Sequence, residues 1–181
     1  MNGAHVELRK AVRTWSPGRA AIASWTNAAL GRRATHREIG VRVVGRAESR
    51  RLNARYRGKD QPTNVLSFPA SPLPAAPRVV AEPQPLGDLV ICPQVLRAEA
   101  REQGKSLRAH WAHLVVHGAL HLIGYDHERA VDARRMERRE IAVLRRLGFT
   151  NPYDAGNPGA VSKKSSRRFF PVTKVLQCRR T

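Results

Sequence analysis

Three histidines in the sequence are spaced as the ligands of one metal ion would be. His117 and His121 are four residues apart in an apolar stretch that predicts a helix, so their imidazoles lie on one face, about 6 Å apart along the axis. Gly124 can end that helix with a left-handed residue and bring His127 back towards the same ion. Three neutral imidazoles leave one position for water or a substrate oxygen, so we predict a catalytic site for one zinc ion, with nickel as the alternative.

The motif H-x-x-x-H-x-x-G-x-x-H has the spacing of the metzincin metal motif. In those proteases a glutamate general base directly follows the first histidine, whereas this sequence has Gly118 at that position. Peptide hydrolysis by that mechanism is therefore not expected. The alternative is a helix whose histidines bind no metal, and the joint spacing of three histidines and a glycine argues against it.

The elements that must position these residues alternate between strand and helix signals along the chain. Short runs rich in β-branched residues predict strands at 5–8, 41–44, 65–68 and 86–91. Helical periodicity and end signals predict helices at 17–30, 48–56, 93–103, 106–123 and 130–147, the first with Ser16 as its N-cap. We predict a single α+β domain in which a small mixed sheet of about four strands packs with about five helices, with the metal site at the end of the central helix.

The composition changes near the end of the chain. Residues 1–153 carry the periodic segments, and a chain of 181 residues suits a single core. Residues 154–181 mix glycine, proline, serine and basic residues without periodicity, so we expect a basic, disordered C-terminal extension that either contacts RNA or is simply solvated. The proline-rich segment 71–85 is expected to be a surface loop.

The chain is strongly basic. It has 33 Lys and Arg against 14 Asp and Glu, a formal net charge of +19, which favours a nucleic acid as partner; an arginine-rich coding bias is the alternative explanation. Only two cysteines are present, which is typical of a reducing compartment. The sequence has no secretory signal and no membrane span, so we expect a cytoplasmic protein.

Other polar residues near the three histidines could support them. His110 and His113 lie on the same helical face as His117. We expect them to form a hydrogen bond that orients a metal-binding side chain, to line the edge of the core or to contact RNA, rather than to bind the metal themselves. Asp126 could orient a ligand imidazole or accept backbone N–H groups in its own turn, and both roles stay open.

The string WAHLVVHGALHLIGYDH, preceded by LNARYRGKDQPTNVLSFP and LGDLVI, resembles the YbeY family of bacterial endoribonucleases, also called rRNA maturation factors. The resemblance runs from about Val41 to Tyr153. It implies a single-strand-specific, metal-dependent endoribonuclease that matures ribosomal RNA, notably the 3′ end of the 16S rRNA, and serves ribosome quality control. Implied partners are small-subunit rRNA, ribosomal proteins and a ribosome-associated GTPase. The family's metal ligands correspond to His117, His121 and His127, and its functional arginine corresponds to Arg57.

Arg57 has the chemistry that this role requires. A guanidinium can bind a scissile phosphate with two N–H groups and stabilise the charge that grows on it, while the ion polarises the phosphodiester and activates either water or the 2′-hydroxyl. Lys59 could make a second contact with RNA. The alternative is a purely structural role, because a basic pair at the C-terminal end of a helix also complements the helix dipole.

A non-catalytic RNA-binding assembly factor with a structural metal is the rival function, and a fourth protein ligand would favour it.

The sequence departs from the family in the many arginines of its last helix and in residues 154–181.

Overall fold

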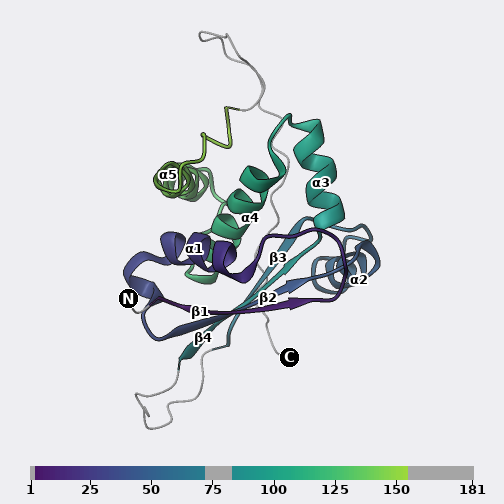
Figure 1. Cartoon of the computed structure of the whole chain (residues 1–181), viewed down its shortest axis with the longest axis horizontal. Coiled ribbons are helices and arrows are strands. Elements are labelled where there is room, and N and C mark those ends of the chain that lie inside the picture. The colour runs from purple at the N-terminus through teal and green to yellow at the C-terminus, as the bar shows by residue number, and fades with distance from the viewer. Residues whose placement is uncertain (1–2, 72–82, 155–181) are drawn as a thin grey trace.

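The computed structural model describes residues 3–71 and 83–154, which form four strands and five α-helices (Figure 1). The strands are β1 (His5–Lys10), β2 (Arg37–Val43), β3 (Val65–Pro69) and β4 (Gln84–Ile91). The helices are α1 (Arg19–Leu30), α2 (Arg46–Arg57), α3 (Pro93–Glu102), α4 (Leu107–Leu122) and α5 (Ala130–Arg146), and a short 3-10 helix, η1 (Gly31–Ala34), follows α1.

The four strands form one mixed sheet in the order β1-β2-β4-β3. β1, β2 and β4 run parallel, with Val41 of β2 beside Leu8 of β1 and Leu89 of β4. β3 runs antiparallel to β4, with Leu66 beside Val90, and forms one edge of the sheet. The helices α1 and α2 lie within the connections that parallel neighbours require.

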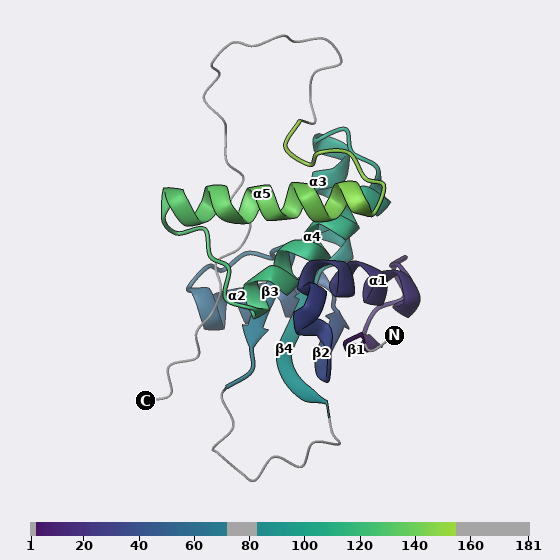
Figure 2. The same ribbon diagram turned by 90° about the vertical axis from the view of Figure 1, so that its left-hand side faces the viewer.

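Helix α4 is the middle layer of the domain. It lies between the sheet and α5, and α1 and α3 pack beside it (Figures 1 and 2). Every residue of α4 from His110 to Leu122 is buried, which explains why this stretch is apolar apart from its four histidines. A polar group on this helix is therefore shielded from water, so leaving it without a partner costs free energy.

Helix α2 packs on the other face of the sheet. Side chains alternate along β3 and β4, so Val65 and Leu89 face α4 whereas Leu66 and Val90 face away from it. Leu52 of α2 packs against this second set. The sheet thus separates α2 from most of α4.

The predicted α+β class, with four strands and five helices, is confirmed. Four predicted starts are wrong, including those of α2, which begins at Arg46 rather than at residue 48, and of β4, which begins at Gln84 rather than at residue 86. The first helix begins at Arg19 with Gly18 as N-cap, because Ser16 and Pro17 stay in the preceding loop. β2 begins at Arg37 rather than at Val41, because pairing with both β1 and β4 recruits the earlier residues.

Two expectations concern segments that the structure does not describe. The proposed C-terminal extension, beyond residue 154, and most of the proline-rich segment 71–85 lie outside the described residues. Across residues 3–71 and 83–154, none of the helices has both the length and the apolar composition needed to cross a bilayer.

Candidate metal centre

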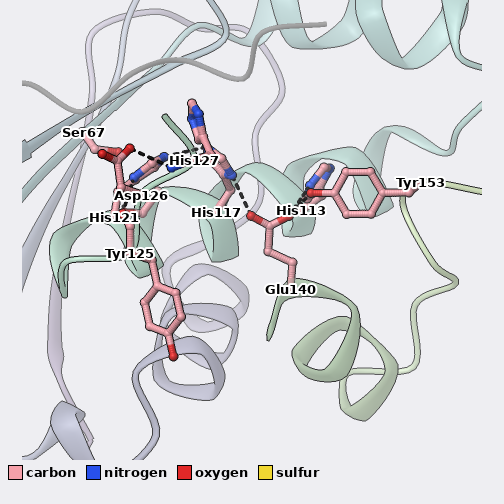
Figure 3. A network of polar contacts seen from close by, with 10 residues as sticks. Ser67, His113, His117, His121, Tyr125, Asp126, His127, Glu140 and Tyr153 are labelled. Atoms are coloured by element: carbon pink, nitrogen blue, oxygen red, sulfur yellow. Dashed lines mark hydrogen bonds and ion pairs between the residues drawn. The ribbon is translucent and has the colours of Figure 1, made fainter. Parts of the chain in front are cut away.

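The predicted histidine ligands meet at the C-terminal end of α4. One ligand nitrogen from each of His117, His121 and His127 lies within 4.8 Å of the others. The Nε2 atoms of His117 and His121 are 2.9 Å apart, and the ring of His127 stacks beside that of His117 with 5.6 Å between centroids (Figure 3). Over the described ranges, no further histidine, cysteine or carboxylate joins this group.

Local backbone geometry brings His127 to the other two histidines. The helical spacing places His117 and His121 on one face of α4, and the chain then leaves the helix at Gly124, whose φ is +89°. The N–H of Gly124 donates to the carbonyl of His121 at 2.9 Å, and the N–H of Tyr125 donates to that of Leu120 at 3.1 Å. These bonds close the helix end and fold the next residues back over it.

Hydrogen bonds fix which nitrogen of each α4 imidazole is free. His117 Nδ1 lies 2.7 Å from Glu140 Oε1, and His121 Nδ1 lies 2.8 Å from the carbonyl oxygen of Tyr125. Because a carboxylate and a carbonyl only accept, each Nδ1 carries the proton and each Nε2 presents a lone pair. Two facing lone pairs at 2.9 Å repel unless a cation lies between them, and His127 Nε2 is buried without a hydrogen-bond partner. The donor set therefore fits a metal ion with nitrogen bonds of about 2.0–2.1 Å.

Glu140 of α5 is the buried carboxylate behind the cluster. Its side chain is 1% exposed and accepts from His117 Nδ1, from His113 Nε2 at 3.1 Å and from the hydroxyl of Tyr153. Burial favours the neutral acid, but the attraction and hydrogen bonds of the two histidines outweigh it and hold the pKa of Glu140 below its usual range. The carboxylate is thus ionised and orients His117.

Burial keeps the imidazoles of His117 and His121 neutral. Burial lowers the pKa of His117, and burial together with the nearby His117 and His127 lowers the pKa of His121 to about 3. Because a metal binds only neutral imidazole, protons compete weakly with an ion at these two positions near pH 7.

Gly118 explains why a protease base is absent. A Cβ atom at this position would lie 2.8 Å from Leu89 Cδ2 and 3.2 Å from Ser67 Oγ, because α4 packs closely on β3 and β4 here. The Cβ atom of a glutamate at this position would already contact side chains of the sheet. The glycine thus allows α4 to pack closely on the sheet, and it also leaves this position without the carboxylate that a protease uses as its base.

The remaining candidate residues occupy three different positions. His113 contacts Glu140, and Asp126 accepts the backbone N–H of His127 at 2.7 Å, which is the turn role of its two alternatives. Arg57 is half-buried at the end of α2, where burial lowers its pKa, and Lys59 is exposed just beyond Gly58. Among the described residues, no hydrogen bond joins Arg57 to the histidines, and α2 packs on the opposite face of the sheet.

Sequence reasoning missed Glu140 and Tyr153. One signal for Glu140 was available: it interrupts an otherwise apolar stripe formed by Met136, Val143 and Leu144 on α5. A carboxylate that faces the core needs buried donors, and the histidines of α4 supply them. No comparable pattern marks Tyr153.

The sequence is similar to a known protein family, to two named relatives and to one solved structure. The family model described as Endoribonuclease YbeY matches residues 11–148. A Methylococcus capsulatus protein named Endoribonuclease YbeY is 52% identical over 149 residues, which cover 81% of this chain and 93% of the relative. A protein of the same name from Alkalilimnicola ehrlichii is 54% identical over 151 residues, covering 82% and 89%. A solution structure of a Thermotoga maritima protein is 23% identical and covers 86% of this chain and 99% of its own, with a TM-score of 0.49.

Proposed function

Since the chain belongs to the YbeY family of endoribonucleases, we propose that it hydrolyses RNA phosphodiester bonds at a divalent metal ion held by His117, His121 and His127. The single observation that carries the metal role is the arrangement of His117 and His121, whose Nδ1 atoms are both occupied while their Nε2 atoms face each other at 2.9 Å. Zinc is the expected ion, since imidazole nitrogen is among its common ligands, and nickel is the alternative.

The residues around the ion have separate roles in this proposal. A bound divalent ion supplies Lewis-acid polarisation of a phosphoryl oxygen and lowers the pKa of water. Glu140 holds the proton of His117 on Nδ1, and the carbonyl of Tyr125 does the same for His121. With three protein ligands, room is left for substrate, which supports a catalytic site over a structural one.

Arg57 is proposed to bind the phosphate beside the scissile bond. It lies at the end of α2 on the far face of the sheet, but α2 leads directly into β3, which is the edge strand. In this proposal an RNA strand passes this edge and contacts both the guanidinium and the histidine cluster. Partial burial favours a strong phosphate contact because it strips water from the guanidinium.

The resemblance favours finer statements, which we also propose. The substrate is single-stranded small-subunit rRNA near its 3′ end, the protein acts in rRNA maturation and ribosome quality control in the cytoplasm, and its partners include ribosomal proteins and a ribosome-associated GTPase. The charge of +19 supports an RNA partner.

The test compares His121→Ala with His5→Ala, a substitution of an exposed histidine on β1. Metal content and cleavage of a single-stranded RNA are measured on both purified variants. We expect His121→Ala to lose both and His5→Ala to keep both. Full RNA cleavage by a metal-free His121→Ala protein would refute the catalytic metal, whereas metal binding without any cleavage by the unaltered protein would favour the assembly-factor alternative.

A further inference from the structure

Helix α5 lies across α4 at the outside of the domain (Figure 2), and six of its arginines lie on the side of the helix away from its buried residues. The α5 arginine face consists of Arg134, Arg135, Arg138, Arg139, Arg145 and Arg146. Five of these side chains are exposed and Arg139 is partly buried. From first to last they extend over about 18 Å at 1.5 Å per residue, enough to follow several phosphates of a nucleic-acid strand.

These arginines have no carboxylate partners in the described parts of the chain. The ion pairs there include Arg129 with Asp132 at the start of α5, but none of the six. Arg134 and Arg138, like Arg135 and Arg139, are like charges four residues apart, an arrangement that destabilises a helix by about 0.2–0.5 kcal/mol per pair. A bound polyanion would remove this repulsion.

The arginine face begins beside the histidine cluster. α5 starts three residues after His127, and the guanidinium of Arg135 lies 5.5 Å from the ring centre of Tyr125, in the loop that leads to His127. Arg33 of η1 donates to the carbonyl of Ile123, at the start of the same loop, at 3.2 Å. Two basic groups therefore contact the turn that carries the third ligand.

We propose that the α5 arginine face binds the phosphate backbone of the RNA substrate on one side of the scissile bond. The proposal rests on the endoribonuclease function and adds a location for the flanking RNA. Charge complementarity favours an anionic partner. RNA is favoured over a membrane surface because the apolar face of α5, with Met136, Val143 and Leu144, is buried against the domain and cannot insert into lipid.

The test uses the full chain with Arg134→Gln, Arg138→Gln and Arg145→Gln combined. The control combines Arg46→Gln, Arg51→Gln and Arg101→Gln, which remove the same charge from exposed positions of α2 and α3. Affinity for a long single-stranded RNA and for a five-nucleotide RNA is measured over a range of salt concentrations. Zinc content and thermal unfolding verify that both proteins are folded.

Each lost phosphate contact lowers the slope of log K against log salt by about 0.7, so three lost contacts lower it by about 2. In ~0.1 M salt we expect the α5 variant to bind the long RNA roughly 10- to 100-fold more weakly, a loss at least tenfold larger than its loss on the five-nucleotide RNA. We expect the control variant to bind the long RNA within about threefold of the unaltered protein.

Equal weakening by both variants would overturn the proposal, because net charge alone would then explain binding. Unchanged RNA binding by the α5 variant would overturn it too. If binding to vesicles that contain phosphatidylserine is also measured, a variant that binds these vesicles more weakly but binds RNA as before would likewise overturn it. Failure of the unaltered protein to cleave RNA would contradict the proposed function instead, while the binding comparison would still decide the role of α5.

Discussion

Glu140→Gln isolates what the buried carboxylate does for the metal site. Glutamine has nearly the same shape, but one of its two acceptor oxygens becomes an NH2 donor. Glu140 Oε2 already accepts from His113 and Tyr153, so the amide oxygen is best placed there and the NH2 group faces His117 Nδ1. His117 must then accept at Nδ1 and carry its proton on Nε2, the nitrogen that the metal requires.

The size of the effect follows from these contacts. The variant loses at least one charge-assisted hydrogen bond inside the protein, the 2.7 Å contact with His117, worth about 1.5–3 kcal/mol. Loss of an outer hydrogen-bond partner of a metal-bound histidine weakens metal binding by about 10- to 100-fold. We therefore expect Glu140→Gln to bind zinc 10- to 100-fold more weakly and to unfold at a lower urea concentration.

The assay is zinc competition with a chelating dye, followed by RNA cleavage at saturating zinc. Glu137→Gln is the matched control, because it changes a partly exposed glutamate on the same helix that makes no hydrogen bond with the histidines. We expect the control to bind zinc normally. Zinc affinity of Glu140→Gln equal to that of the control would refute the tautomer argument.

Gly118→Glu is expected to lower the free energy of unfolding in urea by more than about 3 kcal/mol and to give no peptidase activity on a protein substrate, because its carboxylate would be buried against the sheet. Arg57→Ala is expected to lower kcat on RNA by roughly 100-fold with zinc binding unchanged, and Arg55→Ala, an exposed neighbour, is expected to keep kcat. Acidification between pH 6.5 and about 3 is expected to destabilise the metal-free protein, and His121 alone contributes about 1.4 kcal/mol per pH unit, since its lowered pKa means that the unfolded chain binds the proton first. His121→Asn should flatten this slope in urea titrations, and His5→Asn should not.

The meeting of the three histidines was predictable because they are local in sequence. His117, His121 and Gly124 lie within eight residues, so helix geometry and one glycine turn almost determine where they point. The structure adds the Tyr125 carbonyl, which fixes the tautomer of His121 and belongs to the same turn. The local pattern therefore accounts for the positions of His117 and His121 and for the return of His127 towards them.

Long-range partners were not predictable in the same way. Glu140 is 23 residues from His117, and the contact exists only because α5 crosses α4 with its apolar stripe inward. The start of β2 at Arg37 likewise depends on two neighbouring strands and not on the propensity of its own residues. Arg57 shows the limit most clearly, since the sequence suggests its chemistry but not that α2 packs on the far face of the sheet.

The charges around the cluster favour an anionic substrate over a neutral one. Three neutral imidazoles leave a divalent ion its full charge, and Glu140 offsets one unit of it from behind, so a net positive charge faces the open side. A phosphodiester brings one negative charge and gains more in its transition state, whereas a peptide carbonyl is neutral in the ground state. Because Arg33 and Arg135 contact the same loop and Gly118 supplies no carboxylate for a protease base, the site with an ion bound would favour differential stabilisation of phosphate charge.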